Sequence, residues 1–150
     1  MDKVSIQYHP GLIEELHEEH EVLLKHIEFI RDLVEKKEIK PLPLAMELLR
    51  GEMLQHVSKE ILQLYIYLKY SLDKESDQYR QMKRLRKAMD DMLHKIIEFL
   101  DQSGEVDLND LVKNPEVQES FMKNVQKAVN LLSQRISVEE KVLFPMYKPV

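Results

Sequence analysis

Two stretches of the chain resemble each other, and this repeat decides how the chain is organised. Residues 56–68 read HVSKEILQLYIYL, and residues 135–147 read RISVEEKVLFPMY. Aligning them pairs His56 with Arg135 and Glu60 with Glu139, an offset of 79 residues (135 − 56). The repeat predicts two helices in equivalent places about an approximate two-fold axis, with a possible cofactor site at the midline.

A second, weaker similarity extends the repeat to the helix that precedes each of these two segments. His20 and His94 are 74 residues apart (94 − 20), close to the first offset. Each half of the chain would then contribute one helix with a histidine. It would also contribute one helix with a polar pair four residues apart, and this spacing places both side chains on one helical face.

The remaining sequence favours an all-α protein of one domain, residues 1–150. Only three of the 150 residues are Gly, and long runs are rich in Leu, Glu, Lys and Met. Proline and glycine mark the joints between these runs. The pattern predicts an up-down-up-down four-helix bundle with one longer crossover. The helices are expected at about residues 10–37, 41–71, 75–103 and 115–147, with a connection at 104–115 that includes a short turn at 108–112.

Composition limits the chemistry that such a bundle can carry. The chain has no Cys, which excludes disulfides and cysteine-ligated clusters and leaves His, Asp and Glu as strong metal ligands. The formal net charge of −5 argues against a nucleic-acid partner. No apolar run approaches the roughly 20 residues of a membrane span, and the first residues lack a signal-peptide core. We therefore expect a cytoplasmic protein that binds neither membranes nor nucleic acid.

Helical periodicity indicates which polar side chains point inward. His20 lies at the centre of an apolar stripe on the first helix, and Arg135 and Glu139 lie on the apolar stripe of the fourth. The face around His56 and Glu60 is mixed. An unpaired buried arginine would cost several kcal/mol, so Arg135 is expected to pair with carboxylates. The candidates for that role are Glu139, Glu60 and Glu52.

Other charged groups are expected at the surface. The apolar residues of the third helix are centred well away from His94, so periodicity alone favours a solvent-facing His94. The acidic run from Glu14 to Glu21 is interpreted as a solvated face. The basic residues between Arg80 and Lys87 are interpreted in the same way, although an acidic partner could use them.

The whole pattern resembles the hemerythrin-like, or HHE cation-binding, family, whose last motif looks like residues 136–145, ISVEEKVLFP. The resemblance implies non-haem iron, with two bridging glutamates between a pair of iron ions. It also implies an inward His94, against the periodicity. The ligand set implied by the resemblance is His20, His56, Glu60, His94 and Glu139.

Arg135 departs from the family pattern, because it stands where the family has its fourth-helix histidine. A guanidinium has no lone pair for a metal and adds a fixed positive charge beside the site. Glu52 and Glu140 are the nearest spare carboxylates that could offset it. Three hypotheses remain: a di-metal site, a single-metal site in which Arg135 replaces one ion electrostatically, and a metal-free core.

The resemblance implies several functions, and the sequence does not choose among them. The leading hypothesis is a cytoplasmic di-iron or mono-iron protein, or one with another divalent metal. It would bind or sense oxygen or a related small diatomic ligand, or handle iron. The alternative is a degenerate, metal-free bundle with an Arg135–glutamate network that acts in protein interaction or regulation, as a homodimer or with an unknown partner. Whether the protein is an enzyme is left open.

Overall fold

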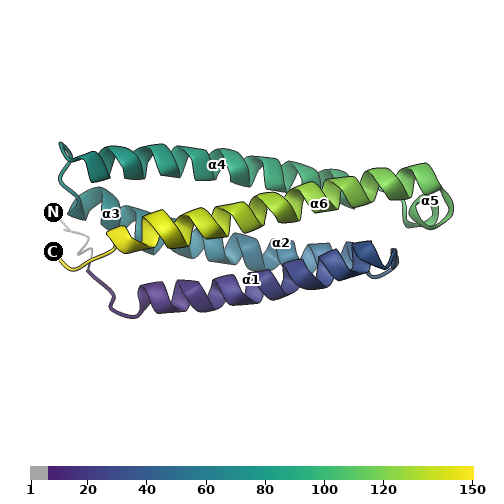
Figure 1. Ribbon diagram of the computed structural model, residues 1–150, viewed down its shortest axis with the longest axis horizontal. Coiled ribbons are helices and arrows are strands. Elements are labelled where there is room, and N and C mark those ends of the chain that lie inside the picture. Colours follow the sequence, from purple (N-terminus) through teal and green to yellow (C-terminus); the bar gives the residue numbers. More distant parts are fainter. Residues whose placement is uncertain (1–6) are drawn as a thin grey trace, which may run out of the picture.

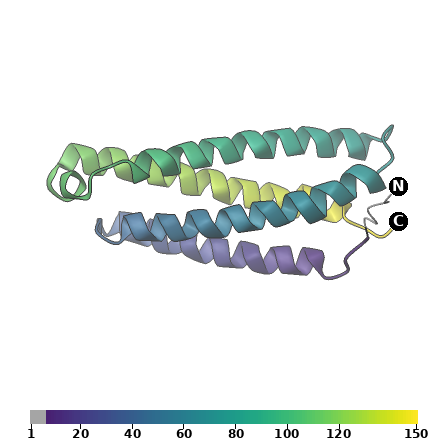
Figure 2. The same ribbon diagram turned by 180° about the vertical axis from the view of Figure 1, so that it is seen from behind.

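The computed structural model describes residues 7–150 as a bundle of four long helical rods. The rods lie side by side along one axis in both views (Figure 1 and Figure 2). The first is α1 (Leu12–Glu35), and the third is α4 (Asp77–Gly104). The second combines α2 (Leu42–Lys59), the π-helix η1 (Glu60–Tyr65) and α3 (Ile66–Ser71). The fourth combines α6 (Pro115–Val138), the π-helix η2 (Glu139–Leu143) and the 3-10 helix η3 (Phe144–Met146).

The predicted all-α bundle is confirmed, and the helices begin where the sequence places turn residues. The Ser76 hydroxyl accepts a hydrogen bond from the backbone N–H of Tyr79 at 3.1 Å and caps α4. The Asn114 side chain accepts from the N–H of Glu116 at 3.0 Å, just before α6 opens on Pro115. These caps satisfy N–H groups that have no partner inside a helix. The expected short turn in the crossover is a helix, α5 (Leu108–Lys113), at one end of the bundle (Figure 1).

The interior is divided into two apolar clusters with a polar layer between them. On α1, Leu16 belongs to one cluster and Leu23 to the other, and buried His20 lies between them along the helix. The same order recurs on the second rod, where Val57 and Leu64 belong to different clusters and enclose Glu60. Burial of the apolar side chains on both sides supplies the main stabilisation. It also holds the polar layer at one level of the bundle.

Candidate metal centre

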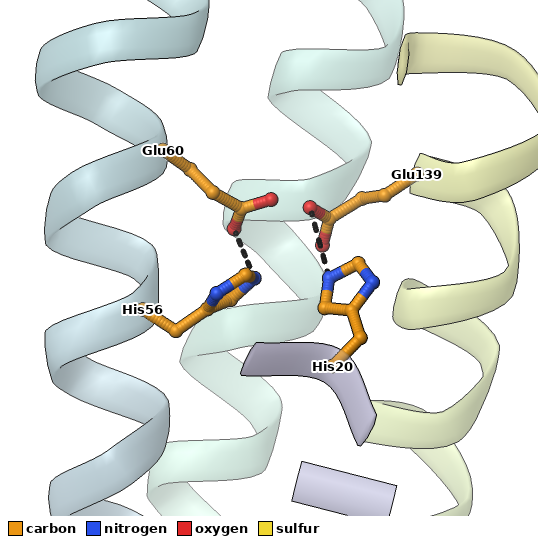
Figure 3. A group of neighbouring side chains, drawn as sticks. All are labelled: His20, His56, Glu60 and Glu139. Atoms are coloured by element: carbon orange, nitrogen blue, oxygen red, sulfur yellow. Dashed lines mark ion pairs between the residues drawn. The ribbon is translucent and has the colours of Figure 1, made fainter. Parts of the chain in front are cut away.

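Four side chains that could ligate a metal meet in this polar layer. His20 from α1, His56 from α2, Glu60 from η1 and Glu139 from η2 each offer a ligand atom, and these atoms lie within 4.8 Å of one another. All four side chains are at most 4 % exposed. Figure 3 shows the two carboxylates facing each other, with an imidazole beside each. Two nitrogen and two oxygen donors of this kind suit iron, zinc or another divalent transition metal.

Each imidazole is paired with one of the carboxylates. His56 Nε2 lies 3.3 Å from Glu60 Oε1, one helical turn away on the same rod. His20 Nε2 lies 3.8 Å from Glu139 Oε2, across the interface between α1 and the fourth rod. The site is therefore built from one local pair and one tertiary pair, drawn as dashed lines in Figure 3.

Arg135 completes the polar layer as its buried cation. Its Nη2 lies 3.5 Å from Glu60 Oε1, and its Nε lies 3.2 Å from Glu139 Oε1. The side chain is 2 % exposed, so the expectation that it points inward and pairs with these two glutamates matches the geometry. Buried carboxylates need a compensating positive charge, and a guanidinium held between the two glutamates supplies part of it.

Many polar atoms of the layer nevertheless lack a hydrogen-bond partner among the described residues. Buried polar groups in folded proteins are nearly always hydrogen-bonded, so a concentration of unpaired ones indicates a ligand site. The unpaired atoms are Nδ1 and Nε2 of His20, Nε2 of His56, Oε2 of Glu60, Oη of Tyr65, Nε and Nη1 of Arg135, and Oε2 of Glu139.

Two outer carboxylates contact the far nitrogens of the histidines. His56 Nδ1 lies 2.7 Å from Glu19 Oε1, and His20 Nδ1 lies 3.4 Å from Glu140 Oε1. When Nδ1–H donates a hydrogen bond to a carboxylate, as His56 does to Glu19, the other nitrogen, Nε2, keeps its lone pair free toward the cluster. This is the usual way in which proteins orient a histidine for metal binding.

The two histidines differ in how the site shifts their pKa. Burial lowers the pKa of His20 to about 4, and the positive charge of nearby His56 adds to the effect. Burial also opposes the charged form of His56, but hydrogen bonds and charges from Glu60 and Glu19 outweigh it and raise the pKa. His20 is therefore neutral near pH 7, as a metal ligand must be.

Both glutamates of the cluster begin a π-helix, a feature that the sequence prediction missed. η1 starts at Glu60 and η2 starts at Glu139, at positions related by the internal repeat. The two widened turns interrupt the rods that were predicted as continuous helices at 41–71 and 115–147. Short π-helical segments inside α-helices occur frequently at functional sites, because the wider turn changes the direction of the side chains around it. In the sequence, only the internal repeat indicated that Glu60 and Glu139 occupy equivalent positions.

Two of the sequence candidates lie outside the cluster. His94 is exposed on α4, as periodicity predicts, so the inward position implied by the family resemblance is corrected. α4 instead has the buried Met89 between Met82 of one apolar cluster and Ile96 of the other. Glu52 is also exposed and forms no ion pair with Arg135, whereas Glu140 is partly buried and contacts His20.

Sequence reasoning also missed Glu19, which was assigned to a solvated face. Its carboxylate bonds His56 and also lies 2.9 Å from Lys59 Nζ. The available signal was the four-residue spacing of Glu15 and Glu19, which places both on one face of α1. Both contact Lys59 across the helix interface.

Comparison with known protein families agrees with this geometry. A model of the hemerythrin HHE cation-binding domain matches residues 11–147, nearly the whole chain. The chain belongs to the hemerythrin HHE family. No curated protein and no solved structure matches the chain. No helix among residues 7–150 is long and apolar enough to cross a membrane.

The residues of this hemerythrin HHE domain fit a bound cation. The donor set is two imidazoles and two carboxylates, and each of the four donors has an unpaired buried atom. A hydrogen bond to Glu19 orients His56, and the Glu140 carboxylate lies 3.4 Å from His20 Nδ1. A cation would give partners to the unpaired acceptors, which no donor among residues 7–150 does.

Proposed function

We propose that this hemerythrin HHE domain binds one divalent metal ion, with iron the leading candidate, on His20, His56, Glu60 and Glu139. The observation that carries the proposal is that four buried ligand groups lie within 4.8 Å of one another and each has an atom without a hydrogen-bond partner. The ion would be held by the two imidazoles and the two carboxylates. When bound, iron supplies one-electron redox chemistry and a coordination position for oxygen or a related diatomic molecule.

Charge favours one ion over two. The two buried glutamates contribute two negative charges, and Arg135 contributes one positive charge. One dication brings this buried group to a net charge of +1, and two dications bring it to +3. Such an excess is costly in an interior with a low dielectric constant. Arg135 contacts both glutamates, so it supplies part of the positive charge that a second ion would provide.

The chain's own residues prepare the site for a ligand. Glu19 holds His56 by a hydrogen bond, Glu140 lies beside His20 Nδ1, and apolar clusters cover the polar layer on both sides along the bundle axis. Arg135 keeps an unpaired Nη1 in the buried layer. This N–H can donate a hydrogen bond to an oxygen atom of a small molecule or anion bound beside the metal.

Metal analysis after anaerobic reconstitution with Fe(II) tests the proposal. We expect about one iron per chain, and we expect the His20→Ala and Glu60→Gln variants to lose it. His94→Ala provides the matched control, because this histidine is exposed on α4 and should leave the content unchanged. Two ions per chain in the unmodified protein would contradict the single-ion proposal.

A metal-free role is the second candidate, and the Arg135 ion pairs favour it. With the guanidinium 3.2 and 3.5 Å from the two carboxylates, the layer holds its own counter-charge without a metal. The bundle would then act in protein interaction or regulation. Absence of bound metal after reconstitution with Fe(II), Mn(II) and Zn(II) would favour this candidate and reject the first.

A further inference from the structure

A polar groove between α1 and α2 reaches the buried cluster from the surface. Its volume is about 250 Å³, and its lining is Glu19, Glu52, Gln55, His56 and Lys59. His56 is 4 % exposed and belongs to the cluster, so the inner end of the groove is a candidate ligand. The other lining side chains are polar and reach solvent. The groove therefore connects bulk water with His56, one of the four candidate ligands.

The groove carries an excess of negative charge. Glu19 and Glu52 line it, and Glu15 lies beside it, within 2.8 Å of Lys59 Nζ. Lys59 is the one cation in this group of four charged side chains, which leaves a net charge of −2. Clefts with one sign of charge concentrate ions of the opposite sign and raise their association rates.

Glu19 links the mouth of the groove to the cluster. One carboxylate oxygen lies 2.9 Å from Lys59 Nζ, and the other lies 2.7 Å from His56 Nδ1. Glu19 is 33 % exposed and Lys59 is 26 % exposed, so both can exchange partners with solvent. An arriving dication competes with the lysine ammonium for the Glu19 carboxylate. The long lysine stem allows the displaced ammonium to move into water.

A groove between α3 and α4 has the opposite charge. It measures about 310 Å³ and is lined by four cations and one carboxylate, along with Tyr79 and Met82. The charged residues are Lys69, Lys83, Arg86, Lys87 and Asp90. Its positive charge repels metal ions, so electrostatics favours approach through the α1–α2 groove.

We propose that the α1–α2 groove is the route by which a divalent cation reaches the buried cluster. Glu19 and Glu52 attract the ion, and Lys59 is the counter-cation that the ion displaces. This inference rests on the proposed metal-binding function and adds the path of the ion. It predicts that charges in the groove control the rate of loading, whereas residues of the cluster control whether metal is held at all.

Rapid mixing of the full metal-free chain with Co(II), followed by visible absorbance, tests the route. At low ionic strength we expect Glu52→Gln to slow loading several-fold and Lys59→Met to accelerate it several-fold. Both effects should shrink in 0.5 M KCl, because salt screens exposed charges. The final cobalt content should stay at the wild-type level, since neither residue is in the cluster.

Matched controls separate this route from a general effect of charge. Glu47→Gln removes an exposed carboxylate from α2 outside the groove, and Lys83→Met removes a cation from the α3–α4 groove. Equal loading rates for Glu52→Gln and Glu47→Gln would overturn the proposed route. A larger acceleration by Lys83→Met than by Lys59→Met would also overturn it. If the unmodified chain takes up no metal, the proposed function fails together with the route, whereas normal uptake with equal rates rejects the route alone.

Discussion

The two repeated segments both begin a π-helix at their glutamate but carry different side chains one turn before it. In residues 56–65 a histidine precedes the glutamate that opens π-helix η1, and in residues 135–144 an arginine precedes the glutamate that opens η2. His56 has an unpaired Nε2 in the cluster, whereas Arg135 contacts both glutamates. The comparison teaches that a π-helix can begin at the glutamate in both segments although one segment offers a histidine nitrogen and the other a fixed cation. The site thereby becomes asymmetric.

Restoring the symmetry should have the largest effect. We expect Arg135→His to raise the metal content from about one to about two ions per chain, because it removes a fixed charge and adds a nitrogen donor. A second ion bound with micromolar affinity corresponds to about 8 kcal/mol. Elemental analysis after anaerobic loading measures the change, with Arg135→Gln as the control that removes the charge without adding an imidazole. Equal metal content in Arg135→His and the parent would contradict this prediction.

Removing the cation altogether should destabilise the metal-free bundle. Arg135→Ala leaves Glu60 and Glu139 buried without their cation, which we expect to cost about 3–5 kcal/mol of unfolding free energy. Urea unfolding in the presence of a chelator measures this loss. Gln134→Ala, at the neighbouring exposed position, should change stability by no more than about 0.5 kcal/mol. A loss similar to that of the control would mean that the ion pairs contribute little.

The two histidines should produce opposite pH dependences in the metal-free protein. The pKa of His20 falls from 6.5 to about 4 on folding. The contribution of His20 to the free energy of unfolding is therefore present above pH 6.5 and is lost as the pH falls toward 4. The full shift corresponds to about 3 kcal/mol. His56 has a raised pKa, so its contribution is present below pH 6.5 and is lost as pH rises through that raised value.

Urea unfolding between pH 4 and 8 with a chelator measures both slopes. His20→Gln should flatten the loss of stability on the acidic side, and His56→Gln should flatten the loss on the alkaline side. His26→Gln is the control, because His26 lies outside the cluster. An unchanged acidic slope in His20→Gln would show that other groups dominate the acid sensitivity.

The smallest effect on stability is expected at one aromatic pair of the repeat, Tyr65 and Phe144. Phe144 stacks on His20 with ring centroids 5.2 Å apart, whereas Tyr65 has a buried hydroxyl without a partner. Tyr65→Phe should therefore stabilise the metal-free protein by up to about 1 kcal/mol, because it removes an unsatisfied polar group. Urea unfolding measures this, with exposed Tyr70→Phe as the control. Destabilisation by Tyr65→Phe would show that the hydroxyl is hydrogen-bonded in solution.

The sequence alone determined the rods and most of the inward side chains. Helix breakers placed the four helices, and the apolar stripes around His20 and Arg135 placed both residues inside, because periodicity and burial are properties of one helix at a time. The repeat also identified Glu60 and Glu139 as equivalent positions. For His94, periodicity predicted the observed exposure and the family resemblance did not.

Only the tertiary structure decided which groups touch across the bundle. The bond from Glu19 to His56 depends on how α1 packs against α2, and the contact from Glu140 to His20 depends on the fourth rod. Periodicity gives a direction around one helix axis, but it does not give the rotation and height of the neighbouring helix. The π-helical turns at Glu60 and Glu139 change that rotation locally, so the convergence of the four donors became visible only in the packed structure.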